Sequence, residues 1–179
     1  MSRLERLVAE VRPGIELRSL AVHDDEAVLA GGAAVFRLPL ALSGSSRLAM
    51  LVRALPELRT RLPVAVAVPR FIGVMPDGVT PFAESPLLPG SPAVALESIA
   101  LGQLAGVLAA LADVPAREAR QWGVEGDGTV LLHGALTLSC LLVDPSRGVL
   151  TGITGWRLRL GEAGEDLAGL PAAVAAALG

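Results

Sequence analysis

One stretch in the second half of the chain, residues 131–156, constrains the fold most strongly. Its sequence is LLHGALTLSCLLVDPSRGVLTGITGW. Two apolar runs, 141–143 and 149–151, flank a short segment in which Pro145 presets φ and Gly148 tolerates a positive φ. The pattern therefore predicts a short strand, a loop, and two further strands joined by a tight turn.

The composition is that of a folded protein with a large apolar core. Of the 179 residues, 52% are hydrophobic and 18% are charged, so the chain is more apolar than an average soluble domain. Charged residues, Pro or Gly interrupt every apolar run before it reaches the ~18 residues that a membrane-spanning helix needs. The first residues carry both charge signs and lack the apolar core of a signal peptide. We therefore expect a cytoplasmic protein without membrane association.

Three residue types are missing, and their absence limits the chemistry. The chain contains no Lys, Asn or Tyr, as expected for a GC-rich bacterial genome, so it has no phosphate-binding Lys and no Asn metal ligand. The net charge of -3 and the 3% of aromatic residues argue against a nucleic-acid partner. Cys140 is the single cysteine, which excludes an intrachain disulfide.

Residues 1–88 predict a compact α+β domain. Apolar residues at helical spacing indicate a helix at 2–11 and another at 45–62, with Ser45 or Ser46 as its N-cap and a kink at Pro56. Five strand-like runs separated by turn residues are expected at residues 15–22, 26–30, 33–38, 68–74 and 80–88. The first three of these runs predict an antiparallel meander.

Residues 89–179 predict a second, mainly helical domain after a Pro- and Gly-rich linker at 88–92. A helix is expected at 94–111, with large apolar residues on one side and small residues on the other, both of them packed. Residues 113–128 are polar and predict a loop. Residues 163–178 predict helical structure that Pro171 interrupts.

Several segments, in order along the chain, resemble the aminoglycoside phosphotransferase-like kinases. The matching segments are VFRLP at 35–39, VAVPRFIGV at 66–74, PFAESPLLPG at 81–90, HGAL at 133–136, LLVD at 141–144, LTGITGW at 150–156 and EDLAGL at 165–170. The resemblance implies a shortened, two-lobed kinase-like α+β fold. Its N-terminal lobe would be an antiparallel five-stranded sheet with one helix, and its C-terminal lobe mainly helical with a short β-hairpin region.

The resemblance also implies that the residues of phosphoryl transfer have been replaced. Ala135 stands where the family has the Asp that orients the acceptor hydroxyl. Cys140 and Gly155 stand at the positions of the metal-binding Asn and Asp. The family also has a helix Glu that pairs with the basic residue of the third strand, and this position falls near Leu48. Because this reaction depends on metal ions and an orienting carboxylate, we expect no phosphotransfer, no metal site and no cofactor.

Each remaining candidate residue has a functional and a structural interpretation. Arg37 could contact a phosphate or another anion, but pairing with a nearby acid such as Asp24 or Asp25 is the favoured interpretation. His133 could act as a base for a nucleophilic Cys140, although a hydrogen-bonded structural His and a buried thiol are more common. The other candidates are expected to be structural: Asp144 as a turn acceptor, Asp166 as an anchor at a helix start, and Trp122 and Trp156 as packing residues.

Three functions therefore remain open. The favoured hypothesis is a catalytically inactive kinase-like protein that binds a protein partner or a second copy of itself. The kinase-like segments are kept in order, while Ala135, Cys140 and Gly155 occupy the positions of the family's catalytic and metal-binding residues. The second is a nucleotide or small-molecule sensor that uses the interlobe cleft. The third is an enzyme with residual phosphotransfer, or with non-phosphoryl chemistry at His133 and Cys140.

Overall fold

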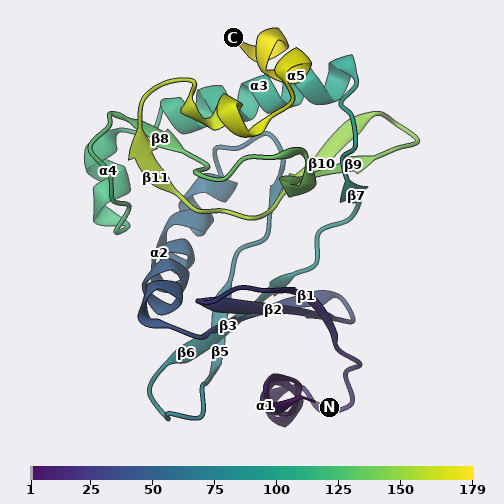
Figure 1. Cartoon of the computed structure of the whole chain (residues 1–179), viewed down its shortest axis with the longest axis vertical. Coiled ribbons are helices and arrows are strands. Elements are labelled where there is room, and N and C mark those ends of the chain that lie inside the picture. Colours follow the sequence, from purple (N-terminus) through teal and green to yellow (C-terminus); the bar gives the residue numbers. More distant parts are fainter. Residues whose placement is uncertain (1) are drawn as a thin grey trace. The chain divides into compact units, whose positions relative to one another are not determined.

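The computed structural model describes residues 2–179 (Figure 1). Its contacts divide the chain into two compact units, which we describe separately. The first unit contains the residues up to Val52 together with Val68–Leu87, and the second contains Arg53–Ala67 and Leu88–Gly179. The segment Arg53–Ala67 therefore groups with the second unit, although it lies within the range that was predicted to form the first domain.

The first unit begins with helix α1 (Arg3–Val11), as predicted. Ser2 caps it: its hydroxyl accepts a hydrogen bond from the Glu5 N–H at 3.2 Å, and the Glu5 carboxylate accepts one from the Ser2 N–H. The helix ends at Val11, and its C-cap Arg12 directly precedes Pro13. Its apolar side then packs against the sheet.

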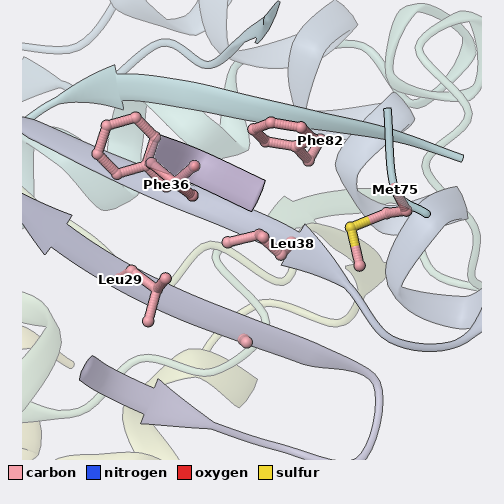
Figure 2. Packing of buried hydrophobic residues seen from close by; sticks show 7 residues of the cluster. Leu29, Phe36, Leu38, Met75 and Phe82 are labelled. Atoms are coloured by element: carbon pink, nitrogen blue, oxygen red, sulfur yellow. The ribbon is translucent and has the colours of Figure 1, made fainter. Parts of the chain in front are cut away.

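The predicted five-stranded antiparallel sheet is confirmed. Its strands are β1 (Arg18–Val22), β2 (Glu26–Gly31), β3 (Ala34–Pro39), β5 (Arg70–Val74) and β6 (Pro81–Pro86), in the order β1-β2-β3-β6-β5. Alternate residues of the inner strands face α1, because successive side chains of a strand point to opposite faces. Figure 2 shows the resulting core, in which Leu29, Phe36, Leu38, Met75 and Phe82 pack together; Val8 of α1 belongs to the same cluster.

Helix α2 (Leu42–Arg59) begins three residues earlier than predicted. Ser45 and Ser46 are therefore not its caps, and the Ser45 hydroxyl donates to the Ala41 carbonyl at 3.3 Å. The early start depends on Gly44, because a Cβ there would lie 2.0 Å from the Asp25 carbonyl oxygen. The helix continues through Pro56 to Arg59.

The second unit combines three helices with short strands. The helices are α3 (Ser98–Ala112), α4 (Ala116–Gln121) and α5 (Ala172–Leu178), and two 3-10 turns, η1 (Leu138–Cys140) and η2 (Glu165–Gly169), accompany them. The strands are β4 (Ala65–Val66), β7 (Ser91–Pro92), β8 (Val130–Leu132), β9 (Leu141–Asp144), β10 (Val149–Ile153) and β11 (Arg159–Gly161). They form two sheets, β4-β10-β9-β7 and β11-β8, so the predicted hairpin is present as β9 and β10.

Two expectations for this unit are wrong. Residues 113–128 contain α4, which is held by an ion pair between Arg61 and Glu118 and by a hydrogen bond from Arg53 Nε to the Trp122 carbonyl at 2.8 Å. Both sets of partners are distant in the sequence, so local polarity did not reveal the helix.

The second error concerns α3, where both faces were expected to be packed. Its large residues Leu104, Val107 and Leu111 are buried. Of the small residues, Ser98, Gly102 and Ala105 are exposed and Gly106 is half-buried. The small-residue side of α3 is thus only partly covered, and α5 contacts the helix. Within residues 2–179, no helix has both the length and the apolar character needed to cross a bilayer.

Candidate functional site

Residues 131–156 contain a tightly fixed loop in the second unit. After β8 the chain turns through His133 and Gly134. Both of their backbone N–H groups donate to the carboxylate of Asp166, at 2.7 and 2.9 Å. Asp166 is 6% exposed; the bond from the His133 N–H is buried and the bond from the Gly134 N–H is partly buried. Asp166 therefore anchors the loop from η2, in agreement with its expected role.

The backbone of the loop also requires glycine at its turn. Gly134 has φ +84, and a Cβ at this position would lie 2.0 Å from the Arg157 carbonyl oxygen. The Arg157 N–H in turn donates to the His133 carbonyl at 3.0 Å. The loop path is thus determined on both sides by backbone contacts.

His133 lies inside this loop with both ring nitrogens engaged. Nε2 is 2.9 Å from the Thr154 carbonyl oxygen, which can only accept, so Nε2 carries the proton. Nδ1 faces the Ala135 N–H at 3.4 Å, and the ring lies 4.5 Å from that of Trp156. Burial lowers the pKa of His133, so the ring is neutral at pH 7. These contacts support the structural interpretation of this residue.

The thiol of Cys140 contacts groups other than the His133 ring. Sγ lies 3.4 Å from the Ala135 carbonyl oxygen and 3.4 Å from the Thr137 hydroxyl. Among residues 2–179 these are its hydrogen-bond partners, so the proposed thiol–imidazole pair is not assembled.

Gly155 lies directly against Cys140. It has φ +74, and a Cβ there would lie 2.8 Å from the Cys140 sulfur. Real Cβ atoms do not approach so closely, and a residue other than glycine would also be strained by this φ. The thiol therefore occupies the space next to position 155 into which a longer side chain would extend.

Arg37 lies in the first unit, and its partner differs from the one expected. Its Nη1 donates to both carboxylate oxygens of Glu26, at 2.8 and 3.0 Å, while the Glu26 side chain is 6% exposed. Asp25 instead pairs with Arg47 of α2. The expected pairing with Asp24 or Asp25 is therefore wrong, although Arg37 is ion-paired as expected.

The geometry explains this error. Arg37 lies opposite Val28 in the register of β2 and β3, which places Glu26 on the same face of the neighbouring strand. The sequence signal that could have pointed to Glu26 as the partner of Arg37 was an acidic residue at the start of the otherwise apolar run EAVLAG. At the position expected for a helix acid, Leu48 is buried in α2 with 1% of its surface exposed.

Comparison with known proteins identifies the fold. No protein-family profile and no curated protein matches the sequence. Among solved structures, the GDP and kanamycin complex of an APH(2″) phosphotransferase superposes with a TM-score of 0.81 at 19% identity, over 98% of this chain and 80% of that one. The chain has the kinase-like fold of the aminoglycoside phosphotransferases.

Further phosphotransferases share this architecture. The macrolide 2′-phosphotransferase MphH from Brachybacterium faecium matches with a TM-score of 0.75 at 22% identity, over 97% of this chain and 80% of that one. The streptomycin–ATP complex of an APH(2″) protein matches with a TM-score of 0.67 at 12% identity, over 93% of this chain and 74% of that one. The predicted resemblance is thus confirmed for the fold.

The residues present at the expected metal position do not fit Mg²⁺. This ion takes oxygen ligands, whereas position 140 offers a thiol and position 155 offers no side chain. Within residues 2–179, no three His, Cys, Asp or Glu side chains gather into a group that could hold a metal ion. The nearby hydroxyls of Thr137 and Ser139 are neutral and lie 2.9 Å from each other.

The remaining candidates have structural contacts. Asp144 accepts hydrogen bonds from the Ser146 hydroxyl and N–H at 2.7 and 2.9 Å, and these bonds lower its pKa. Trp122 and Trp156 are buried, and Trp156 Nε1 donates to the Ile153 carbonyl at 3.1 Å. Asp144 thus supports the turn of the hairpin, Trp156 packs within the loop region, and Trp122 packs at the end of α4.

Proposed function

We propose that this protein does not transfer phosphate and acts by binding a protein partner. The observation that carries the proposal is the contact between positions 140 and 155, where a thiol fills the space beside a glycine. The neighbouring carboxylate of Asp166 is occupied by two backbone N–H groups and supports the loop instead of a substrate.

The expected cost to catalysis follows from the reaction itself. Phosphoryl transfer requires a carboxylate that orients the acceptor and metal ions that offset the developing charge on the phosphate oxygens. Ala135, Cys140 and Gly155 supply neither of these. Preorganised electrostatic groups provide most of the rate enhancement in such sites, so losing all three removes the basis for catalysis.

Arg37 argues against the sensor hypothesis. Its guanidinium already pairs with a buried carboxylate, so the pair as a whole carries no net charge to attract a phosphate. A nucleotide would have to compete with Glu26 or accept a weak contact. We therefore favour protein binding over nucleotide binding.

Exposed apolar side chains support a binding role. In the second unit, Val94 is 94% exposed, and Ile99, in the first turn of α3, is 56% exposed. In the first unit, Leu20, Val22, Phe71 and Val74 are 45%, 64%, 44% and 47% exposed. Exposed apolar side chains that gather into a large patch mark interaction sites.

The test is an assay of phosphate transfer from ATP and GTP with Mg²⁺. Kanamycin and a macrolide serve as acceptors, because solved structures with this fold include complexes or enzymes of those compounds. The proposal predicts product formation at the level of the protein-free reaction. Product that increases in proportion to protein concentration would contradict it, and an active phosphotransferase run in parallel verifies the assay.

A further inference from the structure

An open cavity of about 450 Å³ lies in the second unit, lined by residues of α3, β8, η2 and the end of α5. Both β8 and α5 contact α3 (Figure 1), and all of the lining residues belong to this unit. The volume is within the range of about 300–1,000 Å³ that is usual for small-molecule sites. The cavity is therefore large enough to hold a small organic molecule.

The walls of this cavity are mainly aliphatic. They include Ala105, Ala109 and Leu111 of α3, Leu132 of β8 and Leu167 of η2. Ala105 and Ala109 are exposed, whereas Leu111 and Leu132 are buried. Among residues 2–179, no Arg, His or aromatic residue lines the cavity. Such walls favour a ligand with an aliphatic body, because binding then removes apolar surface from water.

One charged side chain, that of Asp166, also lines the cavity. Its Oδ2 accepts the His133 N–H and its Oδ1 accepts the Gly134 N–H. A carboxylate oxygen has two lone-pair positions, so each oxygen can accept one further hydrogen bond. Burial lowers the pKa of the His133 ring, so this ring contributes no positive charge at pH 7. The carboxylate thus keeps both its negative charge and some of its capacity as an acceptor.

Comparison with the other buried acids shows what this carboxylate lacks. Glu26 is paired with Arg37, and Glu84 is paired with Arg70. Asp166 is equally buried, but in the part of the chain that the structure describes it has backbone N–H groups as partners and no cation. Buried charges are usually paired with an opposite charge. A positively charged group is therefore the element that a ligand in this cavity could supply.

We propose that this cavity binds an aliphatic molecule that carries one protonated amino group, with the ammonium group donating to Asp166 and the aliphatic chain lying against α3. An ammonium group complements the carboxylate in charge and has three N–H donors. A ligand with a carboxylate or a phosphate would instead bring a second negative charge toward Asp166, which is unfavourable. The inference goes beyond the proposed function, since it requires neither a protein partner nor the absence of phosphate transfer.

The test compares octylamine, octanol and octanoate by isothermal titration calorimetry at pH 7, at concentrations where each compound is monomeric. The three compounds share one aliphatic chain and differ in the charge of the head group. Octylamine should bind at least about tenfold more tightly than octanol, because its hydrogen bond to Asp166 joins opposite charges. Octanoate should bind most weakly of the three.

Three variants locate the binding. Ala109→Leu places a larger side chain in the wall of the cavity and should remove the binding of octylamine and octanol. Ala168→Leu makes the same change at an exposed position of η2 outside the lining, and should leave binding unchanged. Asp166→Asn keeps the shape of the side chain without its charge, and should reduce the affinity for octylamine to that for octanol. Thermal melting verifies that each variant is folded.

Any of three outcomes overturns the inference: no binding of octylamine, equal affinities for octylamine and octanol, or octylamine binding that survives Ala109→Leu. If Asp166→Asn does not fold, the series of head groups and the Ala109→Leu variant still decide the question. None of these outcomes bears on phosphate transfer, which the separate assay measures.

Discussion

Two parts of the same loop differ sharply in what they retain. The backbone around His133 and Gly134 is held by the buried carboxylate of Asp166 through bonds of 2.7 and 2.9 Å. Positions 135, 140 and 155 of the same stretch, by contrast, are Ala, Cys and Gly and carry no carboxylate. The backbone conformation of the loop can thus be kept without catalytic side chains. Hydrogen bonds to Asp166 maintain the backbone, whereas phosphoryl transfer would need side-chain oxygens at other positions.

The largest effect is expected from removing the anchor. Asp166→Ala leaves the buried N–H of His133 and the partly buried N–H of Gly134 without this acceptor, and each such loss costs about 1–3 kcal/mol. The free energy of unfolding, measured by urea denaturation, should fall by roughly 2–5 kcal/mol. Ser139→Ala, an exposed change in the same loop, is the control and should alter it little. An Asp166→Ala protein as stable as the unaltered one would show that this carboxylate does not hold the loop backbone in place.

A smaller effect is expected from adding one methyl group at the emptied position. Gly155→Ala forces a non-glycine residue to φ +74 and brings Cβ to 2.8 Å from the Cys140 sulfur. The left-handed conformation alone costs about 1–2 kcal/mol. In a Cys140→Ala background the steric part disappears while the backbone part remains.

The double-mutant cycle therefore separates the two causes. The Cys140→Ala and Gly155→Ala changes should couple by about 0.5–3 kcal/mol, because the residues are in contact. Additive effects on the free energy of unfolding would mean that the thiol does not fill this space.

The pH dependence of stability should report on His133. Its pKa is lowered by burial, so below the unfolded-state pKa of about 6.5 the unfolded chain binds a proton that the folded chain does not. The stabilisation is present above that pH and decreases as the pH falls through it, by at most about 1.4 kcal/mol per pH unit.

Comparison of the two histidines isolates this contribution. His133→Gln should flatten the decrease in the free energy of unfolding between pH 7 and pH 5. His23→Gln, at an exposed turn position, should leave it unchanged. Equal slopes in all three proteins would show that His133 is not held neutral by the loop.

The smallest expected effect concerns nucleotides. Because Glu26 neutralises Arg37, ATP and GTP at millimolar concentration, with or without Mg²⁺, should leave the melting temperature unchanged. A clear upward shift with either nucleotide would revive the sensor hypothesis.

The features that local sequence patterns and the family resemblance could reveal were predicted well. Alternating apolar residues indicated the five strands, and the Pro- and Gly-containing turn indicated the β9–β10 hairpin. The assignment of residues 135, 140 and 155 to the family's catalytic and metal-binding positions rests on matching short motifs in order, and it stays a prediction. These signals are carried by neighbouring residues, so a single sequence contains them.

Apart from the exposed side of α3, the errors involve partners that are distant in the sequence. Gly44 lets α2 begin early because it fits under the Asp25 carbonyl, and Glu26 reaches Arg37 across two strands. Helix α4 depends on Arg53 and Arg61 of another segment. The proximity of Cys140 and Gly155 likewise appears only when the loop is folded, because 15 positions of chain separate them.

The absence of phosphotransfer is tested most directly by the release of labelled phosphate from ATP and GTP in the presence of Mg²⁺, measured over long times. If the protein does not transfer phosphate, the folded protein should release it at the same rate as a heat-denatured sample of equal concentration. A Mg²⁺-dependent excess that increases with protein concentration and is abolished by EDTA would contradict it.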